Sequence, residues 1–240
     1  MRHFDQQLQD LLKKIVLMAS MAEAMIQGAV RSLIERNESL SRDVFEKERQ
    51  VDQLQLEIDE AAVTLVALNQ PMAADVRFLF AASRITSEIE RIGDQAINIC
   101  QNARYVLQFP PLKSMVDIGI MSDIVQKMVR DVLASLVERD VSLAERVIDS
   151  EDQVDAFRDQ IFRTLLTYMM ADPGTIQRAL SLILLSRNLE RIGDHATNIA
   201  EEVIYLVQGR DIRHPSLSAD GRTGGGDNNN GALRTSRNQS

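Results

Sequence analysis

Acidic side chains recur at a spacing of four residues in this chain of 240 residues. The Glu-x-x-x-Asp pairs, with the asparagines that follow two of them after another four residues, are Glu48, Asp52, Glu90, Asp94, Asn98, Glu151, Asp155, Glu190, Asp194 and Asn198. A spacing of four places both members of a pair on one face of a helix. Like charges at this spacing destabilise an isolated helix by about 0.2–0.5 kcal/mol per pair. The sequence therefore predicts that something offsets this repulsion.

A hard cation would offset it. Carboxylate and amide oxygens without thiolate favour Mg, Ca, Mn or ferric iron, and Zn also accepts carboxylates. Two neighbouring helices would bring four carboxylates together, which is enough for a multinuclear metal cluster at the surface. A solvated acidic helix face is the alternative that the spacing leaves open.

The elements that carry these pairs are predicted to be long helices. Apolar residues alternate at steps of four and three from Leu11 to Leu33, which indicates a helix with one buried stripe. Residues 37–41 prefer turns and caps, so we expect a break there. A second helix is expected over about 40–68, and a third over about 71–106 with Pro71 in its first turn.

The pattern then repeats. Residues 32–36 (SLIER) return as 135–139 (SLVER), 103 positions later, and residues 90–94 (ERIGD) return unchanged as 190–194. The sequence therefore predicts an all-α fold of two tandem three-helix bundles from an internal duplication. We expect the first repeat over 1–108, a Pro-Pro linker, the second repeat over 112–208, and a disordered tail over 209–240.

Four further residues invite interpretation. Gly93 and Gly193 recur in mid-helix, where glycine costs about 1 kcal/mol, and they indicate a close helix approach or a tolerated weak point. His195 follows Asp194 but projects about 100° away from it, which is one residue's turn of a helix, so we expect a surface or partly buried histidine. Asp75 is expected to complement a helix dipole, with a role as a further ligand left open.

Composition excludes several classes of protein. The last 32 residues hold five Arg and three Asp and so carry a charge of +2. Because the net charge of the chain is −8, the first 208 residues carry −10, which disfavours nucleic-acid binding. One cysteine favours a reducing compartment. We expect no membrane span, because no uncharged apolar run is long enough. No nucleophile and base occur in a recognisable motif, so an enzyme is not expected.

Three segments resemble one known family. Residues 69–77 (NQPMAADVR), 90–94 (ERIGD) and 190–202 (ERIGDHATNIAEE) are similar to the PhoU family of phosphate transport accessory proteins. The resemblance covers about residues 1–214. It implies two three-helix bundles whose Glu/Asp-x-x-x-Asp motifs bind iron or zinc clusters in some members. All eight acidic positions of those motifs are present in this chain.

The resemblance also implies a function. Family members are cytoplasmic, commonly homodimeric, and regulate phosphate uptake negatively. They act between the ATPase of the phosphate ABC transporter and a sensor histidine kinase. A metal-storage or metal-dependent hydrolytic protein would use the same carboxylates and remains the alternative at this point.

The tail leads to a first prediction. Residues 209–240 hold six of the eleven glycines and few apolar side chains, too few to offset the entropy of ordering. Truncation after about residue 212 should leave the helicity and the melting temperature unchanged, as measured by circular dichroism. A drop of more than a few degrees would show that the tail packs on the body.

Overall fold

The computed structural model describes residues 2–112 and 115–212. The predicted tail lies outside the described residues from position 213 onwards. All regular elements in the described ranges are helices, which confirms the all-α prediction. The elements are α1 (Arg2–Ile34), α2 (Leu40–Asn69), α3 (Ala73–Val106), α4 (Met115–Glu138), α5 (Val141–Asp149), α6 (Glu151–Ala171), the short 3-10 turn η1 (Pro173–Thr175) and α7 (Ile176–Gln208).

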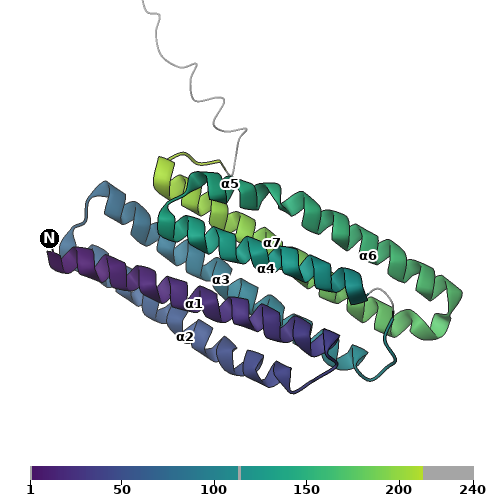
Figure 1. The fold of residues 1–240 in the computed structure, drawn as a ribbon. Helices are drawn as coiled ribbons and strands as arrows, with labels where there is room; N and C mark the ends of the chain where they lie inside the picture. Colours follow the sequence, from purple (N-terminus) through teal and green to yellow (C-terminus); the bar gives the residue numbers. More distant parts are fainter. Residues whose placement is uncertain (1, 113–114, 213–240) are drawn as a thin grey trace, which may run out of the picture.

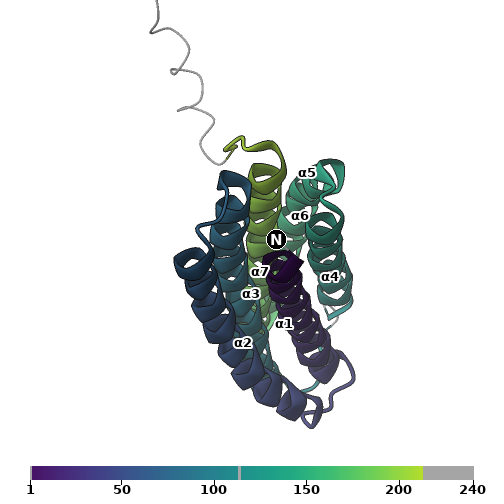
Figure 2. The same ribbon diagram turned by 90° about the vertical axis from the view of Figure 1, so that its left-hand side faces the viewer.

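The helices form two bundles that lie side by side. Helices α1, α2 and α3 pack on one another in the first repeat, and α4, α5, α6 and α7 do so in the second. The bundles meet mainly through α3 and α7, with a smaller contact between α1 and α4. Figure 2 shows α3 and α7 near the centre, with α2 on one side and α5 and α6 on the other.

Helices α3 and α7 run antiparallel along their contact (Figure 1). Near one end Arg84 contacts Glu202 at 3.2 Å, and near the other Tyr105 donates to Gln177 at 2.5 Å. Because the two helices are equivalent members of a duplication, this arrangement relates the repeats by an approximate two-fold axis. Both helices also carry fully buried isoleucines, leucines and alanines, among them Ile89, Ile92, Ala96, Leu189, Ile192 and Ala196.

The turn after the first helix of each repeat is built in the same way. Arg36 and Arg139 occupy equivalent positions, and both adopt a left-handed backbone, with φ of 54° and 56°. A short polar side chain follows: Asn37 accepts from Ser39, and Asp140 accepts from the Leu143 amide at 3.1 Å. Asparagine and aspartate favour such local bonds over continued helix. The structure therefore breaks the helix between Ile34 and Leu40, close to the break expected at 37–41.

Two details differ from expectation. Pro71 precedes α3, because Met72 is extended and the helix begins at Ala73. The counterpart of α2 in the second repeat is interrupted at Ser150, between α5 and α6. The Ser150 hydroxyl donates to the Arg146 carbonyl at 2.8 Å, and a serine bond of this kind bends helices. The equivalent residue of the first repeat is Lys47, within the uninterrupted α2.

The linker is held by both repeats. Arg36 donates to the carbonyls of Leu107 and Phe109 at 2.7 and 2.8 Å, and Arg178 donates to that of Pro110 at 3.1 Å. The predicted boundaries at 108 and 112 lie in this segment between α3 and α4. None of the helices in the described ranges has a stretch long and apolar enough to cross a membrane.

Gly93 and Gly193 mark close helix approaches, which is one of the two interpretations that the sequence left open. A Cβ on Gly93 would lie 3.3 Å from Met25 Cε and 3.8 Å from Val51 Cγ1. A Cβ on Gly193 would lie 3.5 Å from Val154. Each glycine therefore lets the third helix of its repeat approach the core side chains of the other two.

This contact gives a stability prediction. Gly93→Val should lower the free energy of unfolding by about 1–3 kcal/mol, because a branched side chain must displace the buried Met25 and Val51. Gly93→Ala is the control and should be nearly neutral, since the Met25 methyl can yield and alanine favours helix by about 1 kcal/mol. Urea unfolding followed by circular dichroism measures both. Equal stability of the two variants would contradict the close approach.

Candidate metal-binding stripes and the repeat interface

The predicted acidic residues lie in two groups on the outer helix pairs. The first stripe comprises Glu48 and Asp52 on α2 with Glu90 and Asp94 on α3, and the second comprises Glu151 and Asp155 on α6 with Glu190 and Asp194 on α7. Apolar contacts with the other helices of each repeat position these elements: Val51 and Ile92, which flank the first stripe, are 1% exposed. The stripe carboxylates themselves are partly or fully exposed.

The first stripe brings carboxylates together with no basic side chain of the described residues paired to them. Partial burial and the nearby charges of Asp94 and Asp52 raise the pKa of Glu90. Partial burial and the charge of Asp52 raise the pKa of Asp94. No basic side chain in the described ranges lies within 4.0 Å of these carboxylates, and Arg91 pairs instead with Glu88 at 3.1 Å. The charges of Arg91 and His195 offset the repulsion only in part, because the pKa values of Glu90 and Asp94 stay raised.

The second stripe contains a cation of its own. The Arg158 guanidinium contacts Glu190, lies 3.4 Å from Asp155, and pairs with Asp159 at 2.9 Å. Partial burial and the charges of Glu190 and Glu151 still raise the pKa of Asp194. Arg158 lies a full turn beyond the spaced carboxylates, so the spacing alone did not reveal it. A comparison of the two repeats could have revealed Arg158, because the equivalent residue of the first repeat is the neutral Gln55.

The donor chemistry of the first stripe fits a hard cation. Its oxygen donors are the ligands that such ions prefer. Partial burial, and after it the charges of neighbouring carboxylates, raise the pKa values of Glu90 and Asp94. Within the described residues, however, no three Asp, Glu, His or Cys side chains converge on one point as metal ligands. Binding a cation therefore requires these surface carboxylates to rotate toward it.

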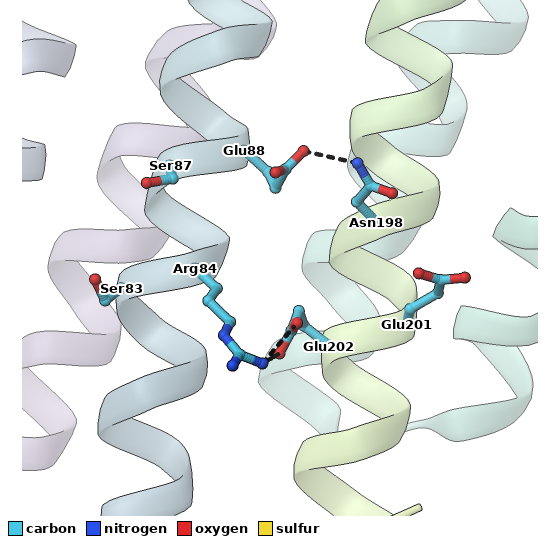
Figure 3. A pocket seen from close by; sticks show the side chains of 7 residues that line it. All are labelled: Ser83, Arg84, Ser87, Glu88, Asn198, Glu201 and Glu202. Carbon is cyan, nitrogen blue, oxygen red and sulfur yellow. Dashed lines mark hydrogen bonds and ion pairs between the residues drawn. The ribbon is translucent and has the colours of Figure 1, made fainter. Parts of the chain in front are cut away.

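The two asparagines of the stripes lie differently. The Asn198 amide donates to Glu88 at 2.9 Å across the repeat interface (Figure 3). Asn98 accepts from Asn102 through its backbone carbonyl at 2.8 Å, so that bond leaves its side chain uncommitted. Asp75 lies in the first turn of α3, as its proposed role beside the helix dipole requires.

A polar cleft separates α3 from α7 at one end of their contact. It has a volume of about 350 Å³, and its walls are Ser83, Arg84, Ser87, Glu88, Asn198, Glu201 and Glu202. Figure 3 shows Glu88 facing Asn198, and Arg84 reaching Glu202 one turn further along. Glu202 is only 5% exposed, so its pairing with Arg84 at 3.2 Å joins the repeats inside the interface.

His195 belongs to this interface. Its Nδ1 lies 2.8 Å from Glu88 Oε2, and the histidine side chain is 15% exposed, in line with the expected partly buried position. Partial burial raises the pKa of Glu88, but the bonds from His195 and Asn198 outweigh it and leave that pKa lowered. Sequence reasoning missed Glu88, because its partners lie 107 and 110 residues away.

The PhoU domain matches twice, at residues 15–103 and 118–203. This chain belongs to the PhoU family. The double match follows the internal duplication, and it confirms the family that the sequence motifs indicated.

Known relatives match over about nine tenths of this chain. The chain is 37% identical over 217 residues to a protein of Pseudomonas putida named phosphate-specific transport system accessory protein PhoU homolog. This match covers 90% of this chain and 85% of the relative. It is 33% identical over 213 residues to the PhoU protein of Escherichia coli strain K12, covering 88% of each.

Solved PhoU structures share the fold. The crystal structure of PhoU from Pseudomonas aeruginosa superposes with a TM-score of 0.83 at 36% identity, covering 86% of this chain and 100% of that one. The PhoU structure from Streptococcus pneumoniae superposes with a TM-score of 0.80 at 22% identity, covering 87% of this chain and 99% of that one. At this identity the match shows the fold alone.

The repulsion within the first stripe gives a prediction for metal-free protein. The raised pKa of Asp94 means that the fold prefers its protonated form, so destabilisation appears as the pH rises above the ordinary value of about 4. In chelator at pH 7, Asp94→Asn should raise the free energy of unfolding by about 0.5 kcal/mol. Near pH 3 the gain should vanish, because the native carboxyl is then neutral too.

Glu88→Gln is the control of opposite sign. The lowered pKa of Glu88 contributes stability above its ordinary value, and that stability is lost as the pH falls. At pH 7 this variant should therefore be less stable than the wild type. Urea unfolding at both pH values measures the two variants. A loss of stability in Asp94→Asn would show that the first stripe is already neutralised.

Proposed function

We propose that this protein is a non-catalytic regulatory adaptor of phosphate uptake. It acts in the cytoplasm, as a homodimer, between the ATPase of the phosphate ABC transporter and its sensor histidine kinase. Membership of the PhoU family supports this, as do relatives named phosphate-specific transport system accessory proteins. The role restrains uptake and the phosphate-starvation response when phosphate is ample.

The observation that carries the proposal is an exposed apolar surface present in both repeats. A groove of about 420 Å³ between α2 and α3 has almost entirely apolar walls. Val63 and Phe80 line it and are 70% and 61% exposed. Their equivalents in the second repeat, Leu166 and Leu180, are 42% and 48% exposed. Exposed apolar patches of this kind mark protein interaction sites.

In the first repeat the groove continues the acidic stripe. Along the antiparallel pair α2 and α3, Gln55 donates to Ser87 at 3.3 Å, and one turn further Ser83 donates to Asp59 at 2.6 Å. Asp59 and Ser83 also line the groove. Acidic and apolar surface therefore share one face of the helix pair. Such a face suits a partner that combines apolar and basic side chains.

The stripes are proposed as the cation sites of this surface. Glu48, Asp52, Glu90 and Asp94 would hold iron or zinc in the first repeat, with Mg, Mn or Ca as further candidates. A bound ion would supply the positive charge that the stripe lacks. The protein's own carboxylates would then be held together, which fixes the face that a partner meets.

An adaptor works only through differential binding. It shifts a partner toward one state only as far as it binds that state more tightly than the other. We therefore infer that the protein binds the transport-restrained transporter and the inhibited kinase better than their active forms. Losing the protein should release both.

This gives a cellular prediction. A deletion strain should express a phosphate-starvation reporter even in rich phosphate, and the wild-type chain should silence it. Val63→Asp combined with Phe80→Asp should fail to silence it, because two charges in the groove oppose burial of an apolar partner surface. Val137→Asp, which changes another exposed apolar residue, 50% exposed on α4, is the control and should silence it.

A reporter that stays silent in the deletion strain would overturn the regulatory role. Full silencing by the groove variant would remove only the groove from the contact surface. Phosphatase and ATPase assays with added metal test the alternative, a metal-dependent hydrolase, and turnover that disappears with the stripe carboxylates would favour it.

A further inference from the structure

The second stripe is filled by a side chain of the protein itself. Arg158 on α6 reaches across to Glu190 on α7, and it also pairs with Asp155 and Asp159 on its own helix. The Arg158 side chain is 32% exposed and that of Glu190 is 19% exposed, so their contact is half-buried. The guanidinium therefore lies where a cation between the two helices would lie.

The first repeat has no such residue. The duplication aligns Arg158 with Gln55, whose neutral amide donates to Ser87 at 3.3 Å. Asp52 and Glu90 have no basic side chain within 4.0 Å among the described residues, and the raised pKa of Glu90 agrees with that. The two stripes thus carry the same carboxylates in different electrostatic settings.

A guanidinium and a metal ion compete for the same oxygens. Arginine stays charged at any physiological pH, and its planar fork matches carboxylate geometry. A divalent ion entering the second stripe must displace Arg158 from Glu190 or accept a positive charge beside it. Either course weakens binding there, whereas neither applies to the first stripe.

We propose that Arg158 is the built-in counter-ion of the second stripe, so that a metal ion binds the first stripe and is excluded from the second. The proposal rests on the cation-binding part of the proposed function. It differs from the sequence expectation of a metal cluster in each repeat. The second stripe does not fit a metal ion while Arg158 lies in it.

A reciprocal exchange tests this. Gln55→Arg gives the first stripe the residue of the second, and Arg158→Gln gives the second stripe the residue of the first. Chelator-treated full-length protein is titrated with Mn²⁺, and bound metal is measured by equilibrium dialysis and elemental analysis. Circular dichroism confirms that each variant is folded.

In the wild type, Mn²⁺ should bind at the first stripe, and Glu90→Gln with Asp94→Asn should remove it. Gln55→Arg should weaken that binding by about 10–100-fold, the usual effect of a changed neighbour of metal ligands. Arg158→Gln should add a second set of bound ions, which Glu190→Gln with Asp194→Asn should then abolish. Arg158→Lys keeps the charge and should keep the second stripe closed.

Two matched controls separate position from net charge. Arg163→Gln removes an exposed charge on α6 that has no ion pair among the described residues, and Gln53→Arg adds one on α2 beside Glu57. Neither should change the number of bound ions. Changes as large as those of the exchange variants would show that overall charge, and not Arg158, decides occupancy.

Three results would overturn the proposal. Wild-type protein that binds Mn²⁺ equally at both stripes would overturn it and leave the proposed cation sites intact. Arg158→Gln protein that gains no metal would do the same. An absence of Mn²⁺ binding in every variant would overturn both it and the cation sites, while the reporter assay would still judge the adaptor role independently.

Discussion

The antiparallel packing of α3 on α7 is the contact on which the rest of the structure depends. Both helices carry a buried row of apolar side chains, and Ile89, Ile92, Leu189 and Ile192 among them are 0–1% exposed. Burial of each such side chain contributes about 1.5–3 kcal/mol. With these helices fixed, α2 and α6 can lie outside them and present acidic and apolar side chains to solvent. The packing of α3 and α7 therefore positions the stripes and the groove.

Local patterns predicted most of the fold. Apolar periodicity and the repeated segments gave the helices, the duplication and the break near Asn37, because each of these depends on residues close together in the chain. The close approach at Gly93 could also be read from a glycine that recurs in mid-helix. The interruption at Ser150 was missed, since it depends on one hydroxyl bond to Arg146 in place of a lysine.

The candidate site was predicted less completely. Spacing placed the carboxylates on shared faces, but it could not show what lies opposite them. Arg158 meets Glu190 from 32 residues away, and Glu88 meets His195 from 107 residues away. Such pairs are decided by how helices pack. Aligning the two repeats comes nearest to finding them, because Arg158 and Glu88 are positions at which the copies differ.

The same differences bear on how the duplication is held as one chain. Glu88 and His195 face each other across the repeats, whereas their equivalents are Asn188 and Gln95. If a first repeat paired with another first repeat in this geometry, Glu88 would face Gln95. If two second repeats paired, His195 would face Asn188. In the first case Glu88 would keep Arg91 of its own helix but lose His195, and in the second His195 would face an amide in place of a carboxylate. The interface therefore favours unlike halves. Divergence at two positions has thus given each repeat a contact that the other repeat makes and a second copy of itself would not.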